Sequence, residues 1–97
     1  MKPVEHVLTL VVQDNNELFL HADGAGLDML IKSLQGLRRS IDDGKCEHDH
    51  MLTEAWGEGS LTESMGCEAE GHVIQHLKLF GWTDEWAEKH GFRKTRK

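Results

Sequence analysis

The sequence lacks the long apolar run that a membrane-spanning helix needs, because no segment of about eighteen apolar residues occurs in it. Its first six residues include an acid and a histidine at positions where a secretory signal would stay apolar. It has few cysteines, Cys46 and Cys67, and a chain that is not exported meets a reducing environment that keeps thiols free. We therefore expect a cytoplasmic protein without a native disulfide.

The signatures of common catalytic sites are also missing. There is no nucleophile elbow, phosphate loop or dinucleotide fingerprint, and Gly24-Ala25-Gly26 has neither the third glycine nor the parallel unit of a nucleotide-binding turn. Internal repeats and low-complexity segments are absent as well. We expect a single domain over residues 1–97 that is not an enzyme.

Basic residues are scarce outside the C-terminus. The formal net charge is −6, and Arg93, Lys94, Arg96 and Lys97 leave residues 1–92 with seven basic residues against 17 acidic ones. Such a charge repels nucleic acid and membrane surfaces and speeds encounter with a basic partner, although it also simply keeps a small protein soluble. We expect neither a nucleic acid nor a membrane as partner, and a flexible basic tail from about residue 92.

The first half of the chain predicts a hairpin followed by an amphipathic helix. Residues 5–12 and 17–22 alternate as strands do, with a polar turn at 13–16 between them. Asp23 is the predicted N-cap of a helix that closes at Asp42-Asp43-Gly44. Its apolar face repeats at three- and four-residue steps through Leu27, Leu30, Ile31, Leu34, Leu37 and Ile41.

The second half predicts two more strands, at 45–53 and 72–82, separated by a long glycine- and acid-rich loop at 54–71. Thr83 is the predicted cap of a short helix that ends before Gly91. The order strand, strand, helix, strand, strand predicts an α+β fold: a four-stranded, mainly antiparallel sheet, one packed helix on one face, and a short C-terminal helix or tail. We expect Trp82 to close one end of the core.

Histidines concentrate on the last two predicted strands. Alternation places Cys46, His48 and His50 on one face of the third strand, and His72 and His76 share a face of the fourth. Zinc takes three or four such ligands, so a metal site of Cys46, His48, His50 and His76 is one interpretation. The others are hydrogen-bonded histidines on a half-exposed strand, and a recognition surface that responds to pH.

Several separated blocks of the sequence resemble immunity protein family 32 of bacterial polymorphic-toxin systems. The blocks run from Ala22 to Leu30, from His48 to Gly57, through Leu61-Thr62, and from His76 to Trp82. The positions that match the family pattern are His48, His50, Trp56, Gly57, Leu61, His76 and Trp82. The resemblance implies a small cytoplasmic protein that binds and neutralises a toxin without catalysis.

The expected function is therefore occlusion of a cognate, basic protein toxin, with no cofactor. The acidic loop after the histidine strand places the expected toxin-binding residues at Glu47, Asp49, Glu54, Trp56, Glu58 and Glu63. The alternative is a small zinc- or other metal-binding protein that uses Cys46, His48, His50 and His76.

Overall fold

A computed structural model describes residues 5–64 and 71–94 of the chain. Its elements are β1 (Leu8–Gln13), β2 (Leu18–Ala22), α1 (Gly24–Asp42), β3 (Glu47–Leu52), β4 (Gly71–Val73), β5 (His76–Gly81) and α2 (Asp84–Lys89). The predicted α+β class and antiparallel pairing are confirmed. Among the described residues, no helix is long and apolar enough to cross a membrane.

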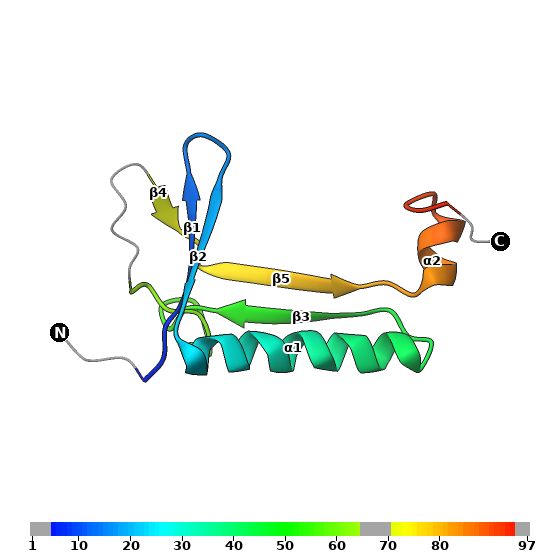
Figure 1. The fold of residues 1–97 in the computed structure, drawn as a ribbon, viewed down its shortest axis with the longest axis horizontal. Helices are drawn as coiled ribbons and strands as arrows, with labels where there is room; N and C mark the ends of the chain where they lie inside the picture. The colour runs from blue at the N-terminus through cyan, green and yellow to red at the C-terminus, as the bar shows by residue number, and fades with distance from the viewer. Residues whose placement is uncertain (1–4, 65–70, 95–97) are drawn as a thin grey trace.

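The strands form two sheets, so the predicted single four-stranded sheet is wrong. One sheet has the order β2-β1-β4, and the other is an antiparallel ribbon of β3 and β5. Figure 1 shows β1, β2 and β4 gathered at one end, across the direction of the ribbon and of α1. The predicted strand at 72–82 splits because Ile74 N–H bonds to the carbonyl of Leu10, 2.8 Å away, while the carbonyl of Gln75 accepts from Thr53 N–H at 3.0 Å. The chain therefore passes from one sheet to the other at residues 74 and 75.

The two ends of α1 lie at the residues predicted from the sequence. The Asp23 side chain accepts from Gly26 N–H at 2.8 Å and from Val7 N–H at 3.0 Å, which fixes the N-terminus of α1 and ties it to the start of β1. These bonds lower the pKa of Asp23, the bond from Val7 most of all. Gly44, with φ of 79°, ends the helix in the left-handed conformation that glycine adopts without cost.

The core lies where the two sheets and α1 meet. Leu8, Leu10, Met51 and Leu61 are buried there, and Met29, Leu30, Ile74, Leu77 and Leu79 pack against them. Further along, α1 covers one face of the ribbon through Leu37 and Ile41, which lie under Gly81. The predicted apolar face of α1 is only partly covered, since Leu27, Ile31 and Leu34 stay 45–48% exposed.

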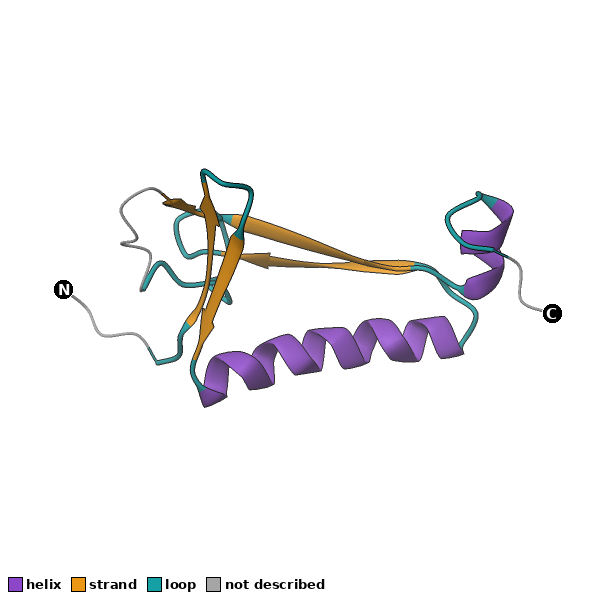
Figure 2. Ribbon diagram, turned by 45° about the horizontal axis from the view of Figure 1, so that its top comes forward, coloured by secondary structure: helices purple, strands orange, loops and turns teal. Residues whose placement is uncertain are grey.

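The last element, α2, lies beyond the far end of the ribbon (Figure 2). Thr83 caps it by accepting from Trp86 N–H at 3.2 Å, as predicted, and Gly91 follows with φ of 77°. Arg93 folds back on α2, with 2.8 Å between its Nη1 and Oδ1 of Asp84. The rest of the predicted basic tail, residues 95–97, lies outside the described part of the chain. The molecule is elongated, with principal extents of 53 × 29 × 22 Å.

Candidate protein-recognition site

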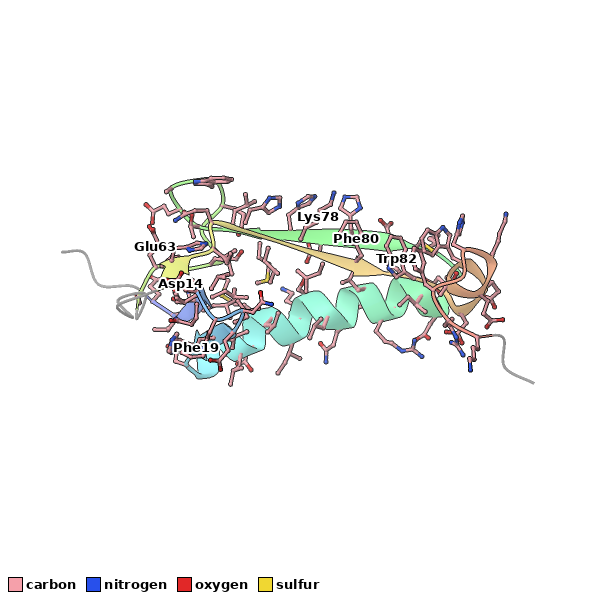
Figure 3. The ribbon with its side chains drawn as sticks, turned by 90° about the horizontal axis from the view of Figure 1, so that it is seen from above. Asp14, Phe19, Glu63, Lys78, Phe80 and Trp82 are labelled. Carbon is pink, nitrogen blue, oxygen red and sulfur yellow. The ribbon has the colours of Figure 1, made fainter. Side chains whose placement is uncertain are left out.

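The β3–β5 ribbon has one face against α1 and one open face. The register pairs His48 with Phe80, His50 with Lys78 and Leu52 with His76. These side chains lie on the open face, because their neighbours Met51, Leu77 and Leu79 pack into the core on the other. Figure 3 shows Lys78 and Phe80 on β5, and Trp82 just beyond its end, following one another toward α2. His48 and His50 thus lie on the opposite face of β3 from Glu47 and Asp49.

Aromatic rings follow one another in contact along this open face, and we call this set the aromatic ladder. Its members are His76, His50, His48, Phe80, Trp82, Trp86 and Phe92, and each ring centroid lies within 4.1–5.9 Å of the next. The expectation that Trp82 closes the core is wrong. Trp82 is 41% exposed and stacks between Phe80 and Trp86, at centroid distances of 5.3 and 4.1 Å.

The ladder presents mainly ring edges. The Phe80, Trp82 and Trp86 rings stack with interplanar angles of 15° and 9°, so much of each face is covered by the adjacent ring. Phe80 nonetheless stays 49% exposed, and Lys78 Nζ lies 5.0 Å from its centroid. Exposed aromatic side chains held by a regular element are the kind that contribute most to protein binding.

Two histidines bond directly at the β4-proximal end of the ladder. His50 Nδ1 lies 2.8 Å from His76 Nε2, so one nitrogen donates and the other accepts. Loss of solvation lowers the pKa of His50, and the nearby charges of His48, His76 and Lys78 lower it further, whereas Asp49 opposes them. His50 is therefore held mainly uncharged near neutral pH.

The acidic residues expected in one toxin-binding set lie in different places, so they do not form a single patch. Asp49 points toward α1, where the hydroxyl of Ser33 donates to it, and its other oxygen accepts from His50 N–H at 2.9 Å. Glu47 shares this side of β3, so neither residue belongs to the open face. Their parity with the buried Met51 could have shown this from the sequence.

Glu58 orders the loop after β3. It accepts from the backbone N–H of Leu52 and Ser60, at 2.9 and 3.0 Å, and from the Ser60 hydroxyl. Partial desolvation raises the pKa of Glu58, but these hydrogen bonds outweigh it, so the net pKa lies below its ordinary value. All of the expected residues are exposed except Asp49, which is partly buried. Glu63 accepts from Gln75 at 3.0 Å. Trp56 is the most exposed tryptophan, at 64%.

The seven positions on which the resemblance rests fall into two groups, those that shape the loop and those that stay at the surface. Leu61 is 1% exposed within the core, and Gly57 lies against Leu52, where an added Cβ would come within 3.2 Å of its side chain. These two residues therefore position the loop. His48, His50, Trp56, His76 and Trp82 remain at the surface.

A set of buried polar residues was not predicted from the sequence. The Thr62 hydroxyl accepts from Leu8 N–H at 2.9 Å and lies 2.6 Å from the Thr9 hydroxyl, and all three residues are buried. Residues 60–62 thus lie against β1 and not in an open loop. Polar residues among glycines gave no sign of this burial.

A shallow groove of about 730 Å³ runs between α1 and the edge of β3. Lys32 and Arg39 line it from the helix, opposite Glu47 and Asp49. The groove is therefore of mixed charge, and at the edge of β3 it is also lined by His48 and His50 of the aromatic ladder.

The residues of the predicted metal site are not gathered around one point. Cys46 Sγ lies 3.7 Å from the Thr83 hydroxyl, whereas the His50–His76 contact is at the opposite end of the ribbon. Within residues 5–64 and 71–94, no group of three histidine, cysteine, aspartate or glutamate residues is arranged to hold a metal ion. His72 pairs with Val12 in the other sheet, so it does not share a face with His76 as predicted, and Cys67 lies outside the described residues.

Comparison of the chain with protein-family models, curated proteins and solved structures gives no match.

Proposed function

We propose that this chain is a non-enzymatic immunity protein, which binds a cognate toxin through the open face of the β3–β5 ribbon and blocks it by occlusion. The observation that carries this proposal is the aromatic ladder, together with the exposed Trp56 at the end of β3. Large aromatic side chains are mostly buried in folded proteins, and those that a protein exposes often anchor its interface with a partner. The blocks that resemble immunity protein family 32 include both ends of this face, His48–Trp56 and His76–Trp82.

The structure changes the set of residues proposed to contact the toxin. Trp56, Phe80 and Trp82 are its centre, with Glu54 and Glu63 as exposed acids at the β4-proximal end. Glu47, Asp49 and Glu58 act indirectly, because they face α1 or hold the loop that carries Trp56. The acidic charge of the chain favours a basic toxin, which the exposed acids attract before the aromatic side chains dock.

Binding to the toxin encoded beside this gene tests the proposal. We expect Trp56→Ala and Phe80→Ala each to weaken the affinity by roughly 30-fold, as the loss of about 2 kcal/mol at an interface anchor does. Phe19→Ala is the matched control, because Phe19 is also an exposed phenylalanine, 38% exposed, but lies in the other sheet. Equal effects of Phe80→Ala and Phe19→Ala, or no binding by the unmodified chain, would refute the assignment.

Metal binding is the second candidate, and the His50–His76 contact is the observation that favours it. Two imidazoles would supply two ligands, and His48 is the nearest third, with its ring centroid 5.0 Å from that of His50. Native mass spectrometry with and without a chelator separates the two functions. A stoichiometric zinc adduct that is lost with His50→Gln would favour this candidate.

A further inference from the structure

The two edges of the β3–β5 ribbon differ, and the edge of β3 is protected. Leu52 N–H donates to Glu58, and the Leu52 carbonyl accepts from Leu61 N–H at 3.0 Å. Both backbone groups of Leu52 thus point away from β5, and by alternation so do those of His50 and His48. His50 N–H is in turn occupied by the Asp49 carboxylate. Loop and side-chain groups therefore block the pairing of another strand along much of β3.

The edge of β5 has no such protection. Because His76 is opposite Leu52, its backbone groups also point outward, and alternation extends this to Lys78 and Phe80. In the part of the chain that the structure describes, no hydrogen bond is made to these outward N–H and C=O groups. A row of unpaired backbone groups is a template for another strand, and a two-stranded ribbon alone is marginally stable.

The two flanks of α1 also differ: the flank beside β3 is polar, and the flank beside β5 is mainly apolar. Lys32, Ser33, Arg39 and Ser40 line the groove beside β3, so the polar flank of the helix lies on that side. Leu27, Ile31 and Leu34 are on the opposite flank, which is the β5 side, and Ile41 reaches under Gly81 of β5. Arg38 shares this flank, where its guanidinium pairs with Asp42 at 3.0 Å. Leu77 and Leu79 of β5 are only half-buried. A mainly apolar helix flank, with one paired arginine, thus lies next to an unpaired strand edge.

The molecule also exposes more surface than a compact monomer of its mass. Its accessible surface is 7078 Å² for 11.0 kDa, whereas a folded monomer of that mass exposes about 5,600 Å². Its radius of gyration is 15.9 Å, against about 12.5 Å for a compact chain of this length. The excess of roughly 1,500 Å² exceeds the ~800 Å² that each partner contributes to a standard interface.

We propose that a second copy of this chain occupies this side, with β5 paired antiparallel to β5 across a two-fold axis. The two ribbons then form one four-stranded sheet with the order β3-β5-β5-β3, and the apolar flanks of the two α1 helices meet beneath it. Strands lie about 4.8 Å apart and each α1 contacts both strands of its ribbon, so the helix axes come about 10 Å apart, close to the usual helix-packing distance.

A two-fold axis makes the interface self-complementary and closed, so pairing stops at the dimer. The aromatic ladder faces away from α1 and stays uncovered, which leaves it free for the toxin. The dimer is therefore independent of the proposed function, and failure of one leaves the other standing.

Light scattering after size exclusion tests this proposal, and the expected mass is twice 11.0 kDa. Ile31→Glu places a charge on the apolar flank and should give a monomer, whereas Gln35→Glu places the same charge on the outer side of α1 and should leave the dimer intact. Lys78→Pro removes only an outward N–H and should also give a monomer, while Lys78→Ala should not. A monomeric unmodified chain, or a dimer that survives both Ile31→Glu and Lys78→Pro, would overturn the proposal.

Hydrogen exchange on the unmodified chain gives a readout that does not depend on any variant folding. The amides of His76, Lys78 and Phe80 should exchange slowly, and faster as dilution separates the copies. Fast exchange of all three amides at high concentration would contradict the dimer. Protection that arises only when toxin is added would assign the β5 edge to a strand of the toxin and refute a second copy.

Discussion

Replacement of Thr62 by valine should destabilise the protein far more than its place in a polar loop would indicate. Thr62 is 7% exposed, and its hydroxyl accepts from Leu8 N–H and lies 2.6 Å from the Thr9 hydroxyl. Valine keeps the shape but leaves a buried N–H without a partner, which costs about 1–3 kcal/mol, and the bond to Thr9 adds about 1 kcal/mol. We expect a total loss of about 2–4 kcal/mol in the free energy of unfolding.

Urea denaturation followed by tryptophan fluorescence, at one protein concentration, measures this loss. Thr9→Val should cost only about 1 kcal/mol, because the Thr62 hydroxyl can still accept from Leu8. The double variant should then cost about 1 kcal/mol less than the sum of the two single variants, since both remove the same hydroxyl contact. A loss below about 0.5 kcal/mol for Thr62→Val, or strict additivity, would refute the burial of residues 60–62 against β1.

Gly26→Ala should lower the free energy of unfolding by about 3 kcal/mol or more, because its Cβ would lie 1.8 Å from the Val7 carbonyl oxygen. In Gly24→Ala the new Cβ meets nothing within 4 Å, so this variant should be neutral or slightly stabilised. Equal melting temperatures of the two variants would contradict this. Glu58→Gln should lower stability at neutral pH by about 1 kcal/mol. Because the folded pKa of Glu58 is lowered, its contribution is present above the unfolded value of 4.5 and is lost as the pH falls through the folded pKa, so the variant should show a shallower acid decline in urea titrations. His50 has a folded pKa below its unfolded value of 6.5, so the unfolded chain binds more protons and stability should fall as the pH drops through about 6.5. His48, His76, Lys78 and Asp49 surround it, and His50→Gln should flatten this dependence; an unchanged slope would show that His50 does not cause it.

Helix caps and turns that a few adjacent residues determine could be predicted from the sequence. The N-cap at Asp23, the glycine after α1 and the Thr83 cap each depend on a few adjacent residues, and all three are observed. The β1–β2 hairpin also follows from alternation around a short polar turn.

The division into two sheets could not be predicted in this way. Residues 72–82 read as one strand, but the hydrogen bonds of Ile74 and Gln75 go to different sheets, to Leu10 and Thr53. Those partners lie more than twenty residues away in the sequence, so only the tertiary arrangement fixes the break.

Only part of the candidate site could be predicted from the sequence, because the rest also depends on the tertiary arrangement. Alternation along β3 placed His48 and His50 together, but the ladder also needs the register of β5, which puts Phe80 opposite His48. Trp82 was assigned to the core because large aromatic side chains are mostly buried, whereas α1 covers only the opposite face of the ribbon at this point.

Side-chain footprinting by hydroxyl radicals, read by mass spectrometry with and without the toxin encoded beside this gene, tests most directly whether the open face of the ribbon is the recognition surface. We expect oxidation of Trp56, Phe80 and Trp82 to fall when the toxin is added, while that of Leu18 and Phe19 on β2 is unchanged. Protection of Leu18 and Phe19 with no change at Phe80 and Trp82 would contradict it.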